Sequence, residues 1–156
     1  MSTQTLPEKK TSAVVKNLRT VLADSYALMG QTHLAHWNVE GPAFFSLHQA
    51  FEAQYTELFA AVDELAERIR ALDHLSPGGL STLAKLSSIT EMAVDRAPAK
   101  DFVAHLIECN ETVIASLVAL REAASDSDPE TQDVAIKRIQ THEKAVWMMR
   151  AFLKNL

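Results

Sequence analysis

The stretch His33–Leu72, with the sequence HLAHWNVEGPAFFSLHQAFEAQYTELFAAVDELAERIRAL, decides the fold that we predict for this chain. Within Ala43–Leu72, apolar and aromatic residues recur in steps of three and four, which is typical of a long helix in a bundle. The dipeptide Gly41-Pro42 separates this helix from the preceding one, because proline disfavours a helical conformation in the residue before it. The stretch therefore predicts two long antiparallel helices joined by a short turn.

The rest of the chain shows the same helical spacing of apolar residues. The run Ser76-Pro77-Gly78-Gly79 ends the second helix, and the sequence LSTLAKLSS in the following segment favours a short helix. The other expected long helices span about Thr11–Asn38, Lys100–Ala124 and Pro129–Leu153, with Thr11 and Asp128 as the N-caps of the first and last. Four long helices with a longer middle connection predict an all-α four-helix bundle with a crossover between helices two and three.

The composition indicates one helical domain. The chain has 156 residues, of which 47% are hydrophobic, and this is enough to bury the core of a single domain. Its net charge of −5 makes it a poor general binder of nucleic acid. No apolar run approaches the roughly 20 residues of a membrane span, and the first residues lack the apolar region of a secretory signal. We expect a cytoplasmic protein with no membrane partner, a short mobile tail over residues 1–10 and a bundle domain over residues 11–156.

Two residues with reactive side chains lie on apolar faces of the predicted helices. Cys109 is the only cysteine, which excludes an intrachain disulfide. It lies on the apolar face of the third helix, so we interpret it as a core residue and not as a nucleophile. His142 lies on the apolar face of the fourth helix, where a core histidine is a better interpretation than a metal ligand.

The second helix carries four side chains that bind hard metal ions: His48, Glu52, Asp63 and Glu67. At about 100° per residue, all four fall on one edge of the helix, beside its apolar face. His48 and Glu52 are four residues apart, and so are Asp63 and Glu67. Each of these pairs can therefore direct two side chains to one point. About 22 Å of helix separates the two pairs. One copy of the helix therefore cannot form a single site from both.

Two copies of the helix can bring the pairs together. If they pack antiparallel across a two-fold axis near Leu58, the first pair of each copy faces the second pair of the other, with Phe59 in the dry centre. His36 ends the first helix just before the turn, so it comes next to His48 and Glu52. Two imidazoles and up to three carboxylates suit Fe(II), and the same set accepts Zn(II), Mn(II) or Co(II).

Other interpretations of these residues stay open at this point. Exposed carboxylates on a helix are usually solvated, and a lone histidine on an apolar face is more often part of the core than a ligand. Two pairs on one edge, together with His36, favour the metal interpretation. No histidine follows a glutamate by three residues. The absence of Glu-x-x-His disfavours the usual di-iron site inside a bundle.

The pattern HWNVxGxxFxxLH over residues 36–48, followed by DExAER over residues 63–68, resembles the Dps family of ferritin-like mini-ferritins, named as DNA-binding proteins from starved cells. The resemblance covers nearly the whole chain, including HEKAVWMMR at residues 142–150. It implies a dodecamer of ferritin-like four-helix bundles around a hollow. It also implies a short helix in the crossover of each bundle.

The resemblance further implies an iron-oxidising site between two-fold related subunits. The implied ligands of its two iron ions are His36 and His48 of one subunit with Asp63 and Glu67 of its neighbour. Glu52 occupies a position where many members carry aspartate. In the family, Fe(II) is oxidised by hydrogen peroxide, or by O2, and stored as a ferric mineral, which protects against oxidative damage. Trp37, next to a ligand, has two interpretations: a one-electron donor or a helix-packing aromatic.

Acidic residues near the start of the fourth helix match the region of the family's iron-uptake pore: Asp126, Asp128 and Asp133. A ring of carboxylates around a three-fold axis would concentrate Fe(II). N-capping is the competing interpretation of Asp128.

The alternative function is a non-specific DNA-binding, nucleoid-protecting assembly with weak or vestigial ferroxidase activity. Family members that bind DNA often use a lysine-rich mobile tail. Here the tail offers Lys9 and Lys10 in an acidic chain. We therefore do not expect DNA binding, and any binding would be non-specific and strongly dependent on salt.

Overall fold

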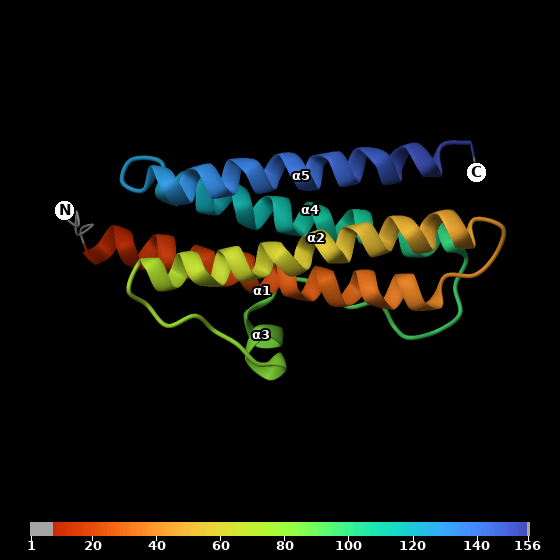
Figure 1. Ribbon diagram of the computed structural model, residues 1–156, viewed down its shortest axis with the longest axis horizontal. Coiled ribbons are helices and arrows are strands. Elements are labelled where there is room, and N and C mark those ends of the chain that lie inside the picture. The colour runs from red at the N-terminus through yellow and green to blue at the C-terminus, as the bar shows by residue number, and fades with distance from the viewer. Residues whose placement is uncertain (1–7, 156) are drawn as a thin grey trace.

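The computed structural model describes residues 8–155, and side chains from residue 13 onward. The helices in chain order are α1 (Glu8–Asn38), α2 (Phe44–Ala71), α3 (Leu80–Leu86), α4 (Ala99–Ala124) and α5 (Pro129–Leu153). The four long helices lie side by side, whereas the short α3 lies against α1, outside the bundle (Figure 1). The predicted all-α four-helix bundle with a short helix in the crossover is confirmed.

The start of α1 differs from the sequence prediction. The helix begins at Glu8, so the prediction of a start and an N-cap at Thr11 was wrong. Glutamate and lysine favour a helical conformation, and an acidic residue is favourable in the first turn of a helix. The helix therefore begins before Thr11, toward the N-terminus. Of the tail expected over residues 1–10, residues 8–10 belong to α1, and residues 1–7 lie outside the described part of the chain.

The core lies between the apolar faces of the four long helices. Phe51 of α2 and Phe102 of α4 are its largest fully buried side chains. By length and composition alone α4 could span a membrane, contrary to the expectation from sequence. Its apolar face is buried among the other helices, however, so α4 is a core helix of the bundle.

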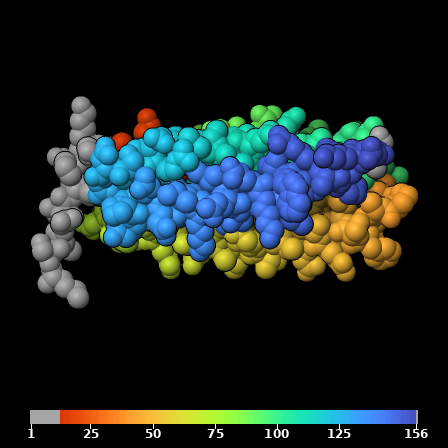
Figure 2. Space-filling model, turned by 90° about the horizontal axis from the view of Figure 1, so that it is seen from above, coloured from red at the N-terminus to blue at the C-terminus, as the bar shows by residue number. Residues whose placement is uncertain are grey.

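On the face shown in Figure 2, α5 runs between α4 and α2. An ion pair joins α2 to the start of α5. The Arg68 guanidinium of α2 donates to a carboxylate oxygen of Asp128 at 2.8 Å. That carboxylate is 1% exposed and also accepts from the backbone N–H of Thr131 at 3.0 Å. Asp128 is therefore the N-cap of α5, as predicted, and it locks the start of α5 to the end of α2.

Two polar side chains of α1 hold the crossover in place. The buried carboxylate of Asp24 accepts from the backbone N–H of Ser88 at 2.6 Å and from the hydroxyl of Ser116 in α4. Gln31, also buried, accepts from the backbone N–H of Met92 at 2.8 Å. Asp24 and Gln31 are separated by about two helical turns and so lie on one face of α1. They fix the crossover at two points along that face.

Candidate metal site at the turn between α1 and α2

His36 and His48 form a tightly joined pair across the α1–α2 turn. Their rings stack with centroids 3.6 Å apart and planes 15° from parallel. The Nδ1 atom of His36 lies 2.8 Å from the carbonyl oxygen of His48, and the Nδ1 atom of His48 lies 2.8 Å from the carbonyl oxygen of His36. The sequence prediction that these histidines lie side by side is confirmed.

These reciprocal hydrogen bonds determine which nitrogen of each ring is available. A carbonyl oxygen only accepts, so each Nδ1 carries the proton and donates it. In the neutral ring, Nε2 then keeps its lone pair, and this is the form that a metal-binding histidine adopts. His36 is 7% exposed and His48 is half-buried. The pair is thus held in a ligand-ready tautomer by the backbone of the opposite helix.

The predicted carboxylate ligands lie along the outer edge of α2. Glu52, Asp63 and Glu67 are all exposed. Glu52 is one turn beyond His48, while Asp63 and Glu67 lie in the second half of the same unbroken helix. Among the described residues, no group of three or more histidine, cysteine, aspartate or glutamate side chains gathers to hold a metal. Within one chain, the structure therefore brings together the two histidines but not the complete predicted set.

An aromatic row extends from the histidine pair to the surface. Tyr55 of α2 meets the edge of the His36 ring, with centroids 5.0 Å apart, and contacts His33 at 4.3 Å. His33 in turn stacks on Trp37 at 5.1 Å, with planes 5° apart. Trp37 is 68% exposed and so does not pack inside the bundle. Sequence reasoning missed His33 and Tyr55, although the four-residue spacing of His33 and Trp37 predicts their contact.

The two other titratable side chains considered from the sequence are both buried in the core. Burial raises the pKa of the Cys109 thiol to about 12, so it stays protonated and unreactive. Burial, and next the Arg138 charge, lower the pKa of His142 to about 3. Its neutral ring lies between Asn110 at 2.8 Å and Arg138 at 3.0 Å. The prediction that both are core residues is confirmed.

The three pore candidates differ in their surroundings. Asp128 is buried and its carboxylate is occupied by Arg68 and by its capping contacts. Asp128 therefore has a structural role, as the N-cap of α5 and as the ion-pair partner of Arg68. Asp126 and Asp133 are exposed. Of the three candidates, these two can face solvent or a neighbouring copy, as can the exposed Glu130 between them.

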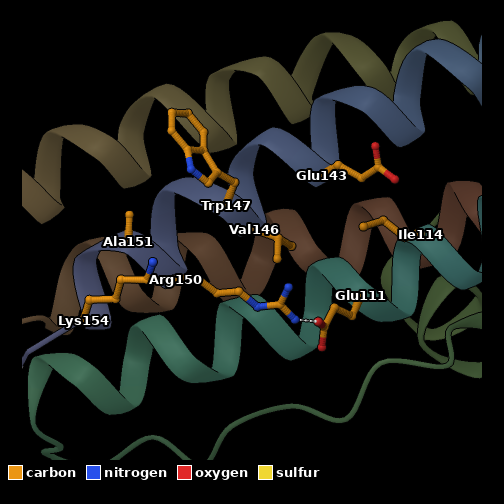
Figure 3. A pocket seen from close by; sticks show the side chains of 8 residues that line it. All are labelled: Glu111, Ile114, Glu143, Val146, Trp147, Arg150, Ala151 and Lys154. Atoms are coloured by element: carbon orange, nitrogen blue, oxygen red, sulfur yellow. Dashed lines mark hydrogen bonds and ion pairs between the residues drawn. The ribbon is translucent and has the colours of Figure 1, made fainter.

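The surface has several cavities outside the histidine pair, among them the following two. One, of about 710 Å³, is bounded by Phe59 and Asp63 of α2 and by the Pro77–Gly79 segment. Phe59 is 71% exposed beside it. The other, of about 510 Å³, lies between α4 and α5, where Trp147 stands at the edge and Arg150 pairs with Glu111 (Figure 3). The first cavity adjoins a predicted ligand, whereas the second contains none.

The chain was compared with known proteins. The ferritin-like domain family matches residues 15–156. An uncharacterized low temperature-induced protein of Nostoc sp. is 34% identical over 152 residues, which cover 96% of this chain and 85% of the relative. DNA protection during starvation protein 2 of Bacillus anthracis is 36% identical over 143 residues, covering 91% and 97%. A Dps protein from Vibrio cholerae, described as a member of a broad superfamily of ferritin-like diiron-carboxylate proteins, superposes with a TM-score of 0.89 at 28% identity, covering 99% and 100%. The chain belongs to the Dps family, within the ferritin-like superfamily.

Proposed function

We propose that the protein is a ferroxidase that oxidises Fe(II) with hydrogen peroxide, or with O2, and stores the ferric product inside a hollow cage of twelve subunits. The observation that supports this most strongly is the His36–His48 pair. Both rings are fixed with Nδ1 donating to a carbonyl, which leaves two Nε2 atoms for a metal ion. If the stacked pair had only a structural role, there would be no reason for both Nε2 atoms to be left without a hydrogen-bond partner.

The remaining ligands come from a second copy of the chain. The partner's Asp63 and the partner's Glu67 complete the set, and Glu52 adds a carboxylate from the histidine side. Phe59 and the cavity of about 710 Å³ beside Asp63 support this arrangement. They provide an exposed aromatic side chain and a hollow on the same face of α2. A two-fold contact requires such a self-complementary surface.

The chemistry follows from holding two Fe(II) ions together as substrates. Hydrogen peroxide accepts two electrons, one from each ion, giving two Fe(III) and two hydroxide ions without a free hydroxyl radical. The imidazoles bind Fe(II) as neutral donors, and the carboxylates offset the positive charge that increases on oxidation. Zn(II), Mn(II) or Co(II) would occupy the same ligands without this reaction. Asp126 and Asp133 attract Fe(II) to the uptake pore.

Consuming Fe(II) and hydrogen peroxide in this way protects the cell from oxidative damage, because the two no longer react in the cytoplasm to give hydroxyl radicals. The relative from Bacillus anthracis is named for DNA protection during starvation. Iron oxidation can serve such protection without direct contact with DNA.

Subunit complementation tests the shared site. We compare His36→Ala/His48→Ala chains, Asp63→Ala/Glu67→Ala chains, and a mixture of both that is unfolded and refolded together. Each mutant alone should lose Fe(II) oxidation. In the mixture, half of the two-fold pairs combine both mutants, and one of their two sites keeps every ligand, so roughly a quarter of the parent activity should return.

The readout is ferric absorbance after anaerobic Fe(II) loading and peroxide addition. Mixing two preparations of the same mutant is the control and should restore nothing. A mixture as inactive as its components, although both chains are assembled, would show that the ligands do not come from two subunits. Parent-like rates in either mutant would show that these residues are not the site.

The alternative of a DNA-binding assembly is supported by Lys9 and Lys10 in the sequence and by the names of relatives such as the Bacillus anthracis protein. A gel shift at low salt, with and without residues 1–10, separates the two functions. We expect no retardation because the chain carries a net charge of −5. A shift that disappears with the tail would favour the DNA-binding function.

A further inference from the structure

We propose that Arg138 is a specificity-determining residue that keeps metal ions out of the bundle core, because its guanidinium occupies the donor atoms of Glu57 and His142. Its Nη1 and Nη2 groups donate to the two carboxylate oxygens of Glu57 on α2, and Nη2 also lies 3.0 Å from Nε2 of His142 on α5. The side chain of Arg138 is only 4% exposed. A buried cation thus contacts a carboxylate and an imidazole from two different helices.

His142 has the hydrogen bonding of a metal-binding histidine. The amide nitrogen of Asn110 donates to the Leu106 carbonyl at 2.8 Å, so its amide oxygen faces Nδ1 of His142, also at 2.8 Å. Because that oxygen only accepts, Nδ1 carries the proton and Nε2 keeps its lone pair. Burial is the largest cause that lowers the pKa of His142 to about 3, so the ring stays neutral. Metal-binding histidines are oriented in this way by a second polar group.

The carboxylate of Glu57 would complete a set of metal donors. Glu57, Asn110 and His142 line one cavity of about 320 Å³, to which all four long helices contribute. A water molecule takes up about 30 Å³, so the cavity has room for a hydrated cation. Two carboxylate oxygens, one imidazole nitrogen and water suit Fe(II) or Co(II), and bundle cores bind metals through side chains of facing helices. Without Arg138, these donors would form a metal site inside the bundle.

Stability alone does not explain a buried arginine at this position. The side chain of Glu57 is 43% exposed, and ion pairs with an exposed partner contribute little. The Nε–H group of Arg138 is buried without a hydrogen-bond partner, which is unfavourable. What the guanidinium does achieve is to occupy all three donor atoms of Glu57 and His142 at once. Its charge also repels a second cation at short range.

Excluding iron from the core matters for the proposed function, and this step rests on that function. A single Fe(II) ion gives hydrogen peroxide only one of the two electrons that it needs. The products are then Fe(III), one hydroxide ion and one hydroxyl radical, which would attack the surrounding core side chains. At the interface, two Fe(II) ions reduce the peroxide completely. Arg138 therefore restricts the reaction to the place where no radical is released.

Co(II) binding tests the role of Arg138 in chains that carry His36→Ala/His48→Ala, so that the interface histidines do not contribute. To this background we add Arg138→Ala, Arg138→Gln or Arg138→Lys, and measure bound Co(II) by equilibrium dialysis and visible absorption. Each neutral variant should bind about one more Co(II) per chain than the background. Arg138→Lys keeps the charge and should bind no more than the background. Adding His142→Ala to Arg138→Ala should remove the extra ion.

Thermal unfolding of the same proteins with and without Co(II) gives an independent readout. A metal that binds only the folded chain raises its Tm, and this holds for a destabilised variant too. Two neutral substitutions are used, so that poor folding of one leaves the other as the test. Folded neutral variants with neither extra Co(II) nor a higher Tm would overturn the proposal. So would extra Co(II) in Arg138→Lys, or extra Co(II) that persists after His142→Ala.

Fe(II) and peroxide, added to chains with intact interface ligands, separate this proposal from the ferroxidase function. By mass spectrometry, Arg138→Ala should show several-fold more oxidation of the peptide that contains His142 than the parent. Equal oxidation of this peptide in both proteins would overturn the protective role of Arg138. Absence of ferric absorbance in the parent would overturn the ferroxidase function, whereas the Co(II) measurements would still decide whether Arg138 blocks a metal site.

Discussion

Replacing Phe59 by alanine should abolish iron oxidation while every proposed ligand stays in place. Phe59 exposes 71% of its surface in the single chain, and the two-fold contact that we propose would bury it. Full burial of such a side chain is worth roughly 1.5–3 kcal/mol, so its removal costs about 2 kcal/mol per copy. Two copies meet at one axis, which gives about 4 kcal/mol and roughly a thousand-fold weaker association.

Sedimentation velocity over a dilution series measures that association, and peroxide-driven Fe(II) oxidation is followed on the same samples. Oxidation should disappear as Phe59→Ala dissociates and should recover where high concentration restores the pair. Trp147→Ala is the matched control, because Trp147 is an aromatic side chain of 65% exposure that lies on α5, beside the cavity between α4 and α5 and not on the α2 face of the proposed contact. If dissociated Phe59→Ala chains oxidised iron at the parent rate, the reasoning for a shared site would be refuted.

Two further predictions concern stability. Asp128→Ala removes the N-cap of α5, which costs about 1 kcal/mol. It also leaves the Arg68 guanidinium, whose side chain is 23% exposed, without a counter-charge and with only the Thr131 hydroxyl as acceptor, so we expect about 3 kcal/mol in total. Thermal unfolding at fixed protein concentration should show a lower Tm, whereas the exposed control Asp126→Ala should change little, and equal effects of the two would contradict the capping role. His142 has a pKa lowered from 6.5 to about 3 in the fold, so the unfolded chain takes up a proton first as the pH falls below 6.5. Stability should therefore decrease by up to about 1.4 kcal/mol per pH unit on acidification, and His142→Gln should flatten this slope. The free energy of unfolding, measured with denaturant at pH 7 and pH 5, gives this slope. An identical slope in the variant would exclude His142 as the source of the pH dependence.

The long helices and the histidine half of the candidate site could be predicted from local sequence. Apolar spacing predicts each long helix, and Asp128 followed by Pro129 predicts the start of α5, because these signals act within one or two turns. The contact between His36 and His48 also follows, since a short turn between antiparallel helices places their ends together. The start of α1 does not follow, because threonine tolerates a helix interior when better helix formers precede it.

Other features depend on contacts between residues far apart in the chain. The burial of Asp24 could not be predicted, since its partners Ser88 and Ser116 come from the crossover and from α4. The hydrogen bonds that fix the histidine tautomers likewise involve backbone carbonyls of the opposite helix. Local spacing carries no signal for such partners. The pairing that we propose between one chain's histidines and another chain's carboxylates would form only on assembly, so a single chain does not contain that contact.

The attachment of the crossover to α1 determines where this protein can accept added sequence. Asp24 and Gln31 hold the backbone at Ser88 and Met92, so any insertion between these two points would break one of the attachments. The chain beyond Met92 up to the start of α4 has exposed side chains such as Val94. A peptide tag or a small binding domain inserted at residues 93–96 would lengthen a surface loop and leave the helix register unchanged. In the single chain, this segment is therefore the position where added sequence disturbs the packing of the helices least.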